Sequence, residues 1–412
     1  MRSLTSLDFL LSVDDTSRIS ALRFQDEEGR FQRAPERGKR TAPSLIELRD
    51  LMNAAQAVER NTETAKDLSF LMGRATSLDG MRPKCSVSDA DGTLYIGKFP
   101  SVDDQKAVTK GEVLALLLAK KAMIDAATAD LVHADGSPIT IVKRFGREGP
   151  KRIMFVSAMS MLGIEDDDEH SYTEVVEAMV QNCEHATRDI HELWRRIAFS
   201  VLITNVDDHL RNHGFLRVAG DKWRLSPAYD VNPAPEKQRM LKTWISEDTG
   251  PEASIEHAVR AAKYFRLDRG QAQAVLTEVL SAVDQWHDVA KSIGMTPAET
   301  DQFEGAFEHT ERAAARKELR TTVAVRSPRP TRAKCTVNSL ILAVREGVGY
   351  LTDARRRAIT RPTARRRPRS RWRMPGRGRR GSRKRGGGLG EGGKDWRSGR
   401  GRRGSAEPAG LT

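Results

Sequence analysis

The 412-residue sequence predicts an α+β fold with two lobes, the first rich in strands and the second rich in helices. Short alternating segments with Asp-Gly turns predominate before residue 150, whereas apolar residues recur at helical spacing from about 171 to 320. The composition then changes abruptly to arginine, glycine and proline. We therefore expect an N-terminal lobe over residues 1–165, a helical lobe over 166–320 and a disordered tail over 321–412.

Hairpins and helices alternate in the expected first lobe. The segments CSVSDADGTLYIGKFP (85–100) and LVHADGSPITIVKRF (131–145) each hold two strand-like runs around an Asp-Gly turn. A helix is expected over 44–59, with Ser44 as its N-cap, and another over 111–124.

Helical patterns dominate the expected second lobe. SYTEVVEAMVQNCE and HELWRRIAFSVLITN predict helices between residues 171 and 205. A short hairpin is expected over 214–230, and helices resume over 254–320. The order of elements is a strand-rich lobe followed by a helical one.

The net charge of +13 is concentrated in the tail, because residues 321–412 contain 26 lysines and arginines but five acids. The first 320 residues are therefore net acidic. The tail cannot bury enough apolar surface to offset its chain entropy, and its charge suits phosphate contacts with nucleic acid. An out-of-frame or decayed end is the equal alternative, since translated GC-rich DNA has this composition.

The positions of the cysteines and the hydropathy of the sequence indicate where in the cell the protein is expected. Cys85, Cys183 and Cys335 are far apart and form no C-x-x-C pair, which argues against a disulfide scaffold or a thiolate zinc site. The first residues lack the pattern of a signal peptide, and no apolar run approaches the roughly 20 residues of a membrane span. We expect a cytoplasmic protein without a membrane partner.

A dense polar segment, TNVDDHLRNHGF (204–215), follows an apolar helical run. Asp207 and Asn212 have the D-x-x-x-x-N spacing of a kinase catalytic loop, in which the Asp accepts a hydroxyl proton and the Asn holds Mg²⁺. Asp230, beyond the next hairpin, is in place for a second metal carboxylate. Singly, each residue is more simply an ordinary cap or turn residue.

Two upstream residues strengthen this interpretation. Lys98 ends an apolar strand, and Glu112 opens the next expected helix. A kinase needs such a strand lysine for the α- and β-phosphates, oriented by a helix acid. The alternatives are a solvent-facing lysine and a first-turn glutamate that complements the helix dipole. The order Lys98, Glu112, Asp207, Asn212, Asp230 is much more specific than any one member.

The segments SLDGMRPKCSVSDADGTLYIGKFPS, KRF, ITNVDDHLRNHGF and WRLSPAYDVNP resemble HipA-type serine/threonine kinases, the toxin components of type II toxin–antitoxin modules. The resemblance covers about residues 7–310. It implies a two-lobed protein-kinase-like fold that uses ATP and Mg²⁺ between its lobes. Carried onto this sequence, it implies that Asp207 is the catalytic base, that Asn212 and Asp230 are Mg²⁺ ligands and that Lys98 binds the ATP phosphates.

Further residues take roles from the same resemblance. It implies that Phe145 lies in the hinge that holds adenine. It also implies that Ser77 is autophosphorylated, which would eject its loop and switch the kinase off, and that Gly80 and Lys84 lie on that phosphate-proximal loop. We place Glu112 and His209 with the ATP-binding residues, His209 because hydrogen bonds from it would orient the catalytic loop.

The sequence departs from the family pattern at several places. No G-x-G-x-x-G loop precedes Lys98, and the small N-terminal subdomain usual in the family is missing. Gly146 stands where the family often has an aspartate after the hinge phenylalanine, which puts the hinge contacts in doubt. The arginine- and glycine-rich tail matches nothing in the family.

The expected function is transfer of the ATP γ-phosphoryl group to a serine or threonine of a protein, with inhibitory autophosphorylation. The resemblance implies a translation-related substrate, such as an aminoacyl-tRNA synthetase. It also implies a HipB-like helix-turn-helix antitoxin as partner, and through that antitoxin DNA.

Two other classes of function stay open. His209 and His213 are four residues apart, the helical spacing of a zinc site, which would suit a metal-dependent phosphohydrolase or nuclease. A kinase would need Mg²⁺ with ATP, whereas a hydrolase would need zinc or manganese alone. The other alternative is a catalytically degraded pseudokinase that binds an antitoxin or nucleic acid.

Overall fold

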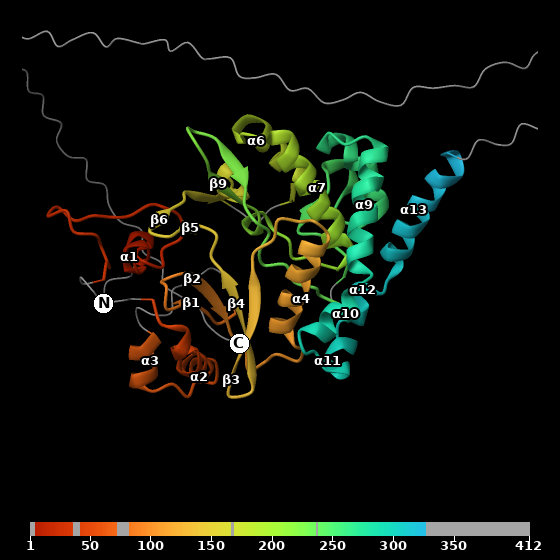
Figure 1. Ribbon diagram of the computed structural model, residues 1–412. Helices are drawn as coiled ribbons and strands as arrows, with labels where there is room; N and C mark the ends of the chain where they lie inside the picture. Colours follow the sequence, from red (N-terminus) through yellow and green to blue (C-terminus); the bar gives the residue numbers. More distant parts are fainter. Residues whose placement is uncertain (1–4, 36–41, 72–81, 166–168, 236–237, 327–412) are drawn as a thin grey trace, which may run out of the picture. The chain divides into compact units, whose positions relative to one another are not determined.

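The computed structural model describes residues 5–35, 42–71, 82–165, 169–235 and 238–326 (Figure 1). Strands are concentrated in the first half of these residues, and helices fill most of the second half. Sheets with antiparallel pairing stand beside a large helical core. The predicted α+β fold class is therefore confirmed.

The main sheet has four antiparallel strands in the order β1-β2-β4-β3. The strands are β1 (Lys84–Ser88), β2 (Leu94–Lys98), β3 (Ala129–Ala134) and β4 (Ser137–Lys143). Both hairpins expected from the sequence are present. The β3–β4 loop consists of Asp135 and Gly136, which both have positive φ, as a two-residue turn between twisted strands requires.

Helix α2 (Leu48–Glu59) covers one face of this sheet. It begins at Leu48 and not directly after Ser44, because Ser44 caps the short 3₁₀ turn η1 (Leu45–Glu47) that precedes it. Its apolar face packs into a small core with strand residues. The buried members of this core are Leu48, Leu51, Met52, Cys85, Val87, Phe99, Ile139 and Ile141. This core fixes the sheet that carries Lys98.

Helix α4 (Val108–Lys121) packs against β3 and β4 and also contacts the helical core (Figure 1). The predicted start at residue 111 was three residues late, so Glu112 lies in the second turn. A Cβ atom on Gly111 would stand 2.6 Å from the Phe303 ring, so this position needs glycine for close packing. Lys110 Nζ lies 2.7 Å from Glu299 and adds an ion pair between the same two regions.

Helix α7 (Ala186–Leu202) is the centre of the helical core. It contacts α6, α8 and α9, and Leu193, Trp194 and Val201 on it are fully buried. The other helices of this region are α5 (Ala158–Leu162), α6 (Tyr172–Asn182), α8 (Ile255–Ala261), α9 (Arg269–Val283), α10 (Trp286–Ser292), α11 (Pro297–Asp301), α12 (Glu304–Phe307) and α13 (Thr310–Arg326). Three 3₁₀ turns are η2 (Leu210–Asn212), η3 (Glu247–Thr249) and η4 (Ala262–Phe265).

Smaller sheets lie between the main sheet and the helices along the chain. The order β10-β9-β7 includes the β9–β10 hairpin expected within 214–230. These strands are β7 (Phe155–Ser157), β9 (Gly214–Arg217) and β10 (Trp223–Leu225). Strand β5 (Arg147–Glu148) pairs with β6 (Lys151–Arg152), and β8 (His170–Ser171) pairs with β11 (Thr243–Trp244). Two further helices, α1 (Ser6–Ser12) and α3 (Ala65–Leu71), lie early in the chain.

The predicted domain limits are only partly covered by the described residues. Helix α13 continues through the expected boundary at residue 320 as far as Arg326. The expected disorder of the rest of the tail, 327–412, lies outside the described residues, and the boundary at 165 stays a prediction. Among the described residues, no helix combines the length and apolar character needed to cross a membrane.

Candidate active site

Three of the predicted site residues meet at the end of β2. Lys98 Nζ lies 2.6 Å from Glu112 Oε1 of α4 and 2.7 Å from Asp230 Oδ1. The Lys98 and Glu112 side chains are 15% and 4% exposed, so neither is a solvent-facing surface group. Lys98 is therefore not a solvent-facing lysine, and Glu112 is not an exposed first-turn glutamate. We call Lys98, Glu112 and Asp230 the central triad.

Burial and charge act against each other in the central triad. Burial raises the pKa of Glu112, and the Lys98 ammonium offsets only part of that effect. Burial would also raise the pKa of Asp230, but the charge and hydrogen bond of Lys98 outweigh it and lower that pKa to about 2. Burial opposes the charge of Lys98, yet the two carboxylates raise the pKa of this lysine. One buried ammonium therefore neutralises two carboxylates from different elements.

A strained turn presents Asp230 to the triad. Asp230 has a φ of 55°, a left-handed conformation that aspartate adopts more readily than most residues. Asn232 Nδ2 donates a hydrogen bond of 3.1 Å to Asp230 Oδ1. The Asn232 backbone N–H also donates to Asn205 Oδ1 over 3.1 Å, which ties this turn to the polar segment 204–215.

The polar segment begins where α7 ends, and it is a loop with one 3₁₀ turn, η2. Asp207 is exposed between buried Val206 and Asp208. Asn212 Nδ2 donates to the Asp207 carbonyl oxygen over 3.2 Å, and the Asn212 N–H donates to the His209 carbonyl oxygen over 2.8 Å. These bonds fold the loop back on itself. Asn212 therefore uses its amide N–H groups to hold the loop and keeps its side-chain oxygen as an acceptor.

A buried polar network centred on Asp208 lies behind this loop. It was not predicted from the sequence. Asp208 is 5% exposed and accepts hydrogen bonds from Tyr172 over 2.7 Å and from Ser200 over 3.3 Å. His213 Nε2 lies 3.1 Å from Asp208 Oδ1, close enough for ionic attraction although outside hydrogen-bond geometry. Burial would raise the pKa of Asp208, but these neighbours lower it. The network fastens the loop to α6 and α7.

An aromatic group connects Phe145, the predicted hinge residue, to the same loop. The Phe145 ring centroid lies 5.6 Å from that of Tyr229 and 6.3 Å from that of Phe155. The Tyr229 hydroxyl donates to the Arg211 carbonyl oxygen over 2.7 Å. Burial and the nearby Asp230 carboxylate raise the pKa of Tyr229, so it stays a neutral donor. Phe145 therefore lies beside the residue that precedes Asp230.

His209 was expected to orient the catalytic loop through hydrogen bonds, and the structure tests this for one of its ring nitrogens. Its Nδ1 atom is buried without a hydrogen-bond partner among the described residues, so the predicted orientation of the loop by its ring through this atom is not present. The His209 backbone makes the loop bonds instead, donating to the Asp207 carbonyl over 3.1 Å. Within the described ranges, no group of three His, Cys, Asp or Glu side chains could hold a metal ion, so the pair His209 and His213 does not gain a third such ligand.

The remaining predicted residues lie at or beyond the edge of the described chain. Lys84 begins β1 directly opposite Lys98 in the strand register. Ser77 and Gly80 fall within 72–81, outside the described residues, so their predicted roles stay predictions.

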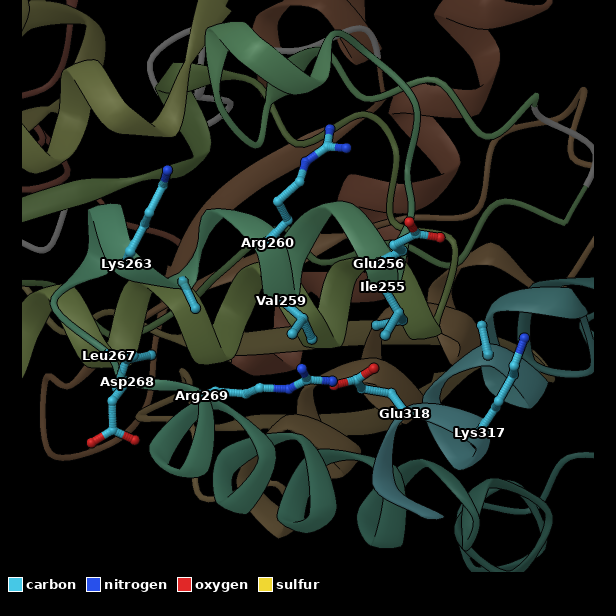
Figure 2. Close-up of a pocket in the computed structure, with 12 residues that line it drawn as sticks. Ile255, Glu256, Val259, Arg260, Lys263, Leu267, Asp268, Arg269, Lys317 and Glu318 are labelled. Atoms are coloured by element: carbon cyan, nitrogen blue, oxygen red, sulfur yellow. The ribbon is translucent and has the colours of Figure 1, made fainter. Parts of the chain in front are cut away.

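A separate hollow of about 640 Å³ lies between α8, the start of α9 and α13 (Figure 2). Arg269 and Glu318 form an ion pair of 2.8 Å in its wall. None of the predicted site residues lines this hollow. Its charged groups of both signs give no arrangement for a reaction, so the central triad stays the candidate site.

Comparison with known proteins identifies a family for this chain. A family model described as the HipA-like C-terminal domain matches residues 76–287, which include the central triad and the polar segment. A Haemophilus influenzae protein named "Putative kinase" is 25% identical over 186 residues, 39% of this chain and 54% of that protein. "Putative kinase Y4dM" of Sinorhizobium fredii is 28% identical over 159 residues, 35% of this chain and 38% of that protein. The matches thus span about half or less of these relatives.

Solved structures with partial similarity include two bacterial proteins. HipA from the Shewanella oneidensis complex of HipA, HipB and operator DNA aligns with a TM-score of 0.45 and 16% identity, covering 60% of this chain and 63% of that chain. The Helicobacter pylori proinflammatory kinase CtkA aligns with a TM-score of 0.46 and 13% identity, covering 60% of this chain and 93% of that chain.

Proposed function

The chain belongs to the family of HipA-like C-terminal domain proteins, and on that premise we propose that it is a protein serine/threonine kinase. The observation that carries the proposal is the central triad, in which Lys98 bonds to Glu112 and Asp230. A strand lysine held by a helix glutamate, beside a carboxylate for metal, is the arrangement that phosphoryl transfer from ATP requires.

The donor atoms around Asp230 and Asn212 suit Mg²⁺, which prefers oxygen ligands. Asp230 Oδ2 accepts no hydrogen bond from the described residues, and the side-chain oxygen of Asn212 is likewise unused. We propose that these two oxygens hold Mg²⁺ when ATP binds. Bound ATP would supply the transferable phosphoryl group, with Phe145, Lys84 and His209 as proposed nucleotide contacts.

Each remaining residue has one task in the proposed reaction. Asp207 takes the proton from the attacking hydroxyl group as the phosphoryl group leaves ATP. Lys98 places positive charge beside the nucleotide phosphates, and Glu112 keeps the lysine in position. Since Asp207 is exposed, a hydroxyl group on another protein can reach it.

Family membership also motivates proposals for regulation and partners. We propose that Ser77 is autophosphorylated with loss of activity, and that the chain acts as a toxin bound by a helix-turn-helix antitoxin and, through it, DNA. A translation protein such as an aminoacyl-tRNA synthetase is the proposed substrate. Mass spectrometry of ATP-treated protein tests the switch, and an unmodified Ser77 in inactivated protein would contradict it.

Transfer of radiolabelled phosphate from ATP to protein tests the catalytic proposal. Asp207→Asn should lower the rate about a hundredfold or more, because a positioned general base contributes about 10²–10⁴-fold. Asp221→Asn is the matched control, since Asp221 is a 97% exposed acid on the β9–β10 turn. Phosphoamino-acid analysis reports whether serine or threonine is labelled. An unlabelled wild type, or equal rates for both variants, would refute the assignment.

A further inference from the structure

A second polar hollow, of about 660 Å³, lies where the β1–β2 turn, the end of β4 and the β5–β6 hairpin meet. Four basic side chains line it, from Lys143, Arg144, Arg147 and Arg152. We call these residues the basic cluster. No member of the central triad lines the hollow, so it is separate from the candidate active site.

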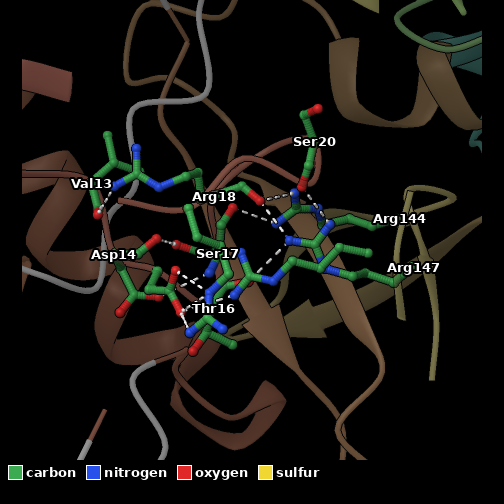
Figure 3. A network of polar contacts seen from close by, with 11 residues as sticks. Val13, Asp14, Thr16, Ser17, Arg18, Ser20, Arg144 and Arg147 are labelled. Atoms are coloured by element: carbon green, nitrogen blue, oxygen red, sulfur yellow. Dashed lines mark hydrogen bonds and ion pairs between the residues drawn. The ribbon is translucent and has the colours of Figure 1, made fainter. Parts of the chain in front are cut away.

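Two guanidinium groups of the basic cluster contact neutral acceptors. Arg144, 8% exposed, donates to the carbonyl oxygens of Ser17 over 2.6 Å and Arg18 over 3.3 Å. Arg147 donates to the carbonyl oxygens of Arg18 over 2.6 Å and Ser20 over 3.1 Å. Figure 3 shows both side chains turned toward this backbone segment. Neither arginine has a carboxylate partner among the described residues.

Among the described residues, the carboxylate that forms an ion pair with the basic cluster already has two partners. Asp15 Oδ2 lies 3.0 Å from Arg152 Nη2 and 2.6 Å from Arg23 Nη2. Arg152 Nη1 is buried and has no hydrogen-bond partner in the described part of the chain. A buried donor without a partner destabilises the fold, and an acceptor from a ligand would offset that cost.

The surplus positive charge has an electrostatic cost. Burial and the neighbouring arginines together lower the pKa of Arg144 to about 9. Burial and Arg152 lower the pKa of Arg147 to about 10, although the Asp15 carboxylate acts in the opposite direction. Two acids also line the hollow, but both are exposed, and Glu148 is paired with Lys151 over 3.2 Å. Asp91, the other, lies in the β1–β2 turn. The described chain therefore leaves this buried charge without adequate compensation.

We propose that the hollow binds a small molecule through a phosphate or carboxylate group. Lys143 and Arg152 supply hydrogen-bond donors to the anion, and Arg144 and Arg147 supply fixed positive charge behind them. Guanidinium groups match both kinds of oxyanion, and the volume suits a ligand larger than one free phosphate. Because the site includes the residues on both sides of Phe145, its ligand contacts the proposed hinge.

Calorimetric titration of the full chain without nucleotide tests this site, using inorganic phosphate and citrate as separate probes. At least one should bind with a Kd below about 1 mM. Lys143→Ala should weaken that binding about tenfold, because it removes a charge-assisted donor. The Lys143 side chain is exposed and makes no hydrogen bond within the described chain, so its removal should leave the fold intact.

Lys291→Ala is the matched control, since it removes the same charge from an exposed position on α10. Arg152→Lys keeps the charge but loses the guanidinium, and it should also weaken binding. Binding of one probe alone identifies phosphate or carboxylate as the ligand group. The proposal is overturned if neither probe binds, or if Lys143→Ala and Lys291→Ala bind equally well. The titration contains no ATP, so failure of phosphoryl transfer has no bearing on it.

Discussion

Lys98 is shared between Glu112 and Asp230, and that sharing makes the central triad a coupled unit. With Lys98→Met, two carboxylates would face each other without their common ammonium group. We expect a loss of unfolding free energy of up to about 3 kcal/mol, because removing one partner leaves buried charge uncompensated. The double variant with Glu112→Gln should be more stable than the sum of the single changes predicts by about 1 kcal/mol or more.

Chemical denaturation of the two single variants and the double variant measures this coupling. The exposed pair Lys151 and Glu148, with side chains 72% and 61% exposed, is the matched control. Lys151→Met and Glu148→Gln should show a coupling free energy below about 0.5 kcal/mol. Additive effects at Lys98 and Glu112 would contradict the shared-ammonium interpretation.

Sequence spacing was sufficient to find the members of the triad, because each stands at a recognisable place in its own element. It was insufficient for Asp208, a loop residue whose partner Tyr172 is 36 residues upstream on α6. The adjacent acids at 207 and 208 were the available signal, since one of two neighbouring residues in a loop after a buried helix tends to face inward. Spacing alone also could not show that His209 Nδ1 is buried without a hydrogen-bond partner among the described residues.

Strand β9 lies close to the aromatic rings of Phe145, Phe155 and Tyr229, and Gly214 permits this approach. A Cβ atom there would overlap the Phe155 ring and stand 3.0 Å from Ser226 Oγ. The ring cannot move aside easily, because it also packs on Phe145 and Tyr229. We expect Gly214→Ala to lower the free energy of unfolding by about 1–3 kcal/mol through overpacking.

Thermal and chemical denaturation give the measurement for Gly214→Ala. Gly305→Ala is its control, because a Cβ at this α12 position would meet Pro235 at an ordinary contact distance of 3.4 Å. Alanine also favours a helix over glycine, so this control should be neutral or slightly stabilising. If Gly214→Ala is as stable as the control, then the close approach does not constrain β9.

Element boundaries were predictable where local signals were strong. The Asp-Gly turns fixed both hairpins of the main sheet, and Ser44 marked the start of the helical segment, which opens with the 3₁₀ turn η1 before α2. The start of α4 was misplaced because KAVTKGE has no strong cap, and its first turn is held by tertiary contacts such as Lys110 with Glu299. Short strands such as β8 and β11 carry no readable pattern, since each has two residues.

At the scale of the whole molecule, His309 links the last helices to the end of α7. Its Nε2 lies 3.0 Å from the Leu202 carbonyl oxygen. Burial lowers the pKa of His309 to about 4 from 6.5, and the nearby charge of Arg239 contributes. The unfolded chain therefore binds a proton here at higher pH than the folded chain does. Stability should fall as the pH decreases from about 6.5 to 4.

His309→Gln removes this titration while keeping a side-chain donor for Leu202. The unfolding free energy of the wild type should fall by about 2–3 kcal/mol more than that of the variant between pH 7 and pH 4. Denaturation with urea at several pH values measures the difference. Parallel pH profiles for the two proteins would show that His309 is not the responsible group.

The arrangement of Lys98 between two carboxylates gives the site an internal counter-ion. Nucleotide phosphates that attract the ammonium would withdraw it from Asp230, and that carboxylate would then lose its nearest cation. The affinity of Asp230 for a divalent cation would therefore rise only after the nucleotide has bound. If the proposed kinase function holds, the protein without nucleotide would bind free metal ions weakly, and bound ATP would raise its affinity for Mg²⁺.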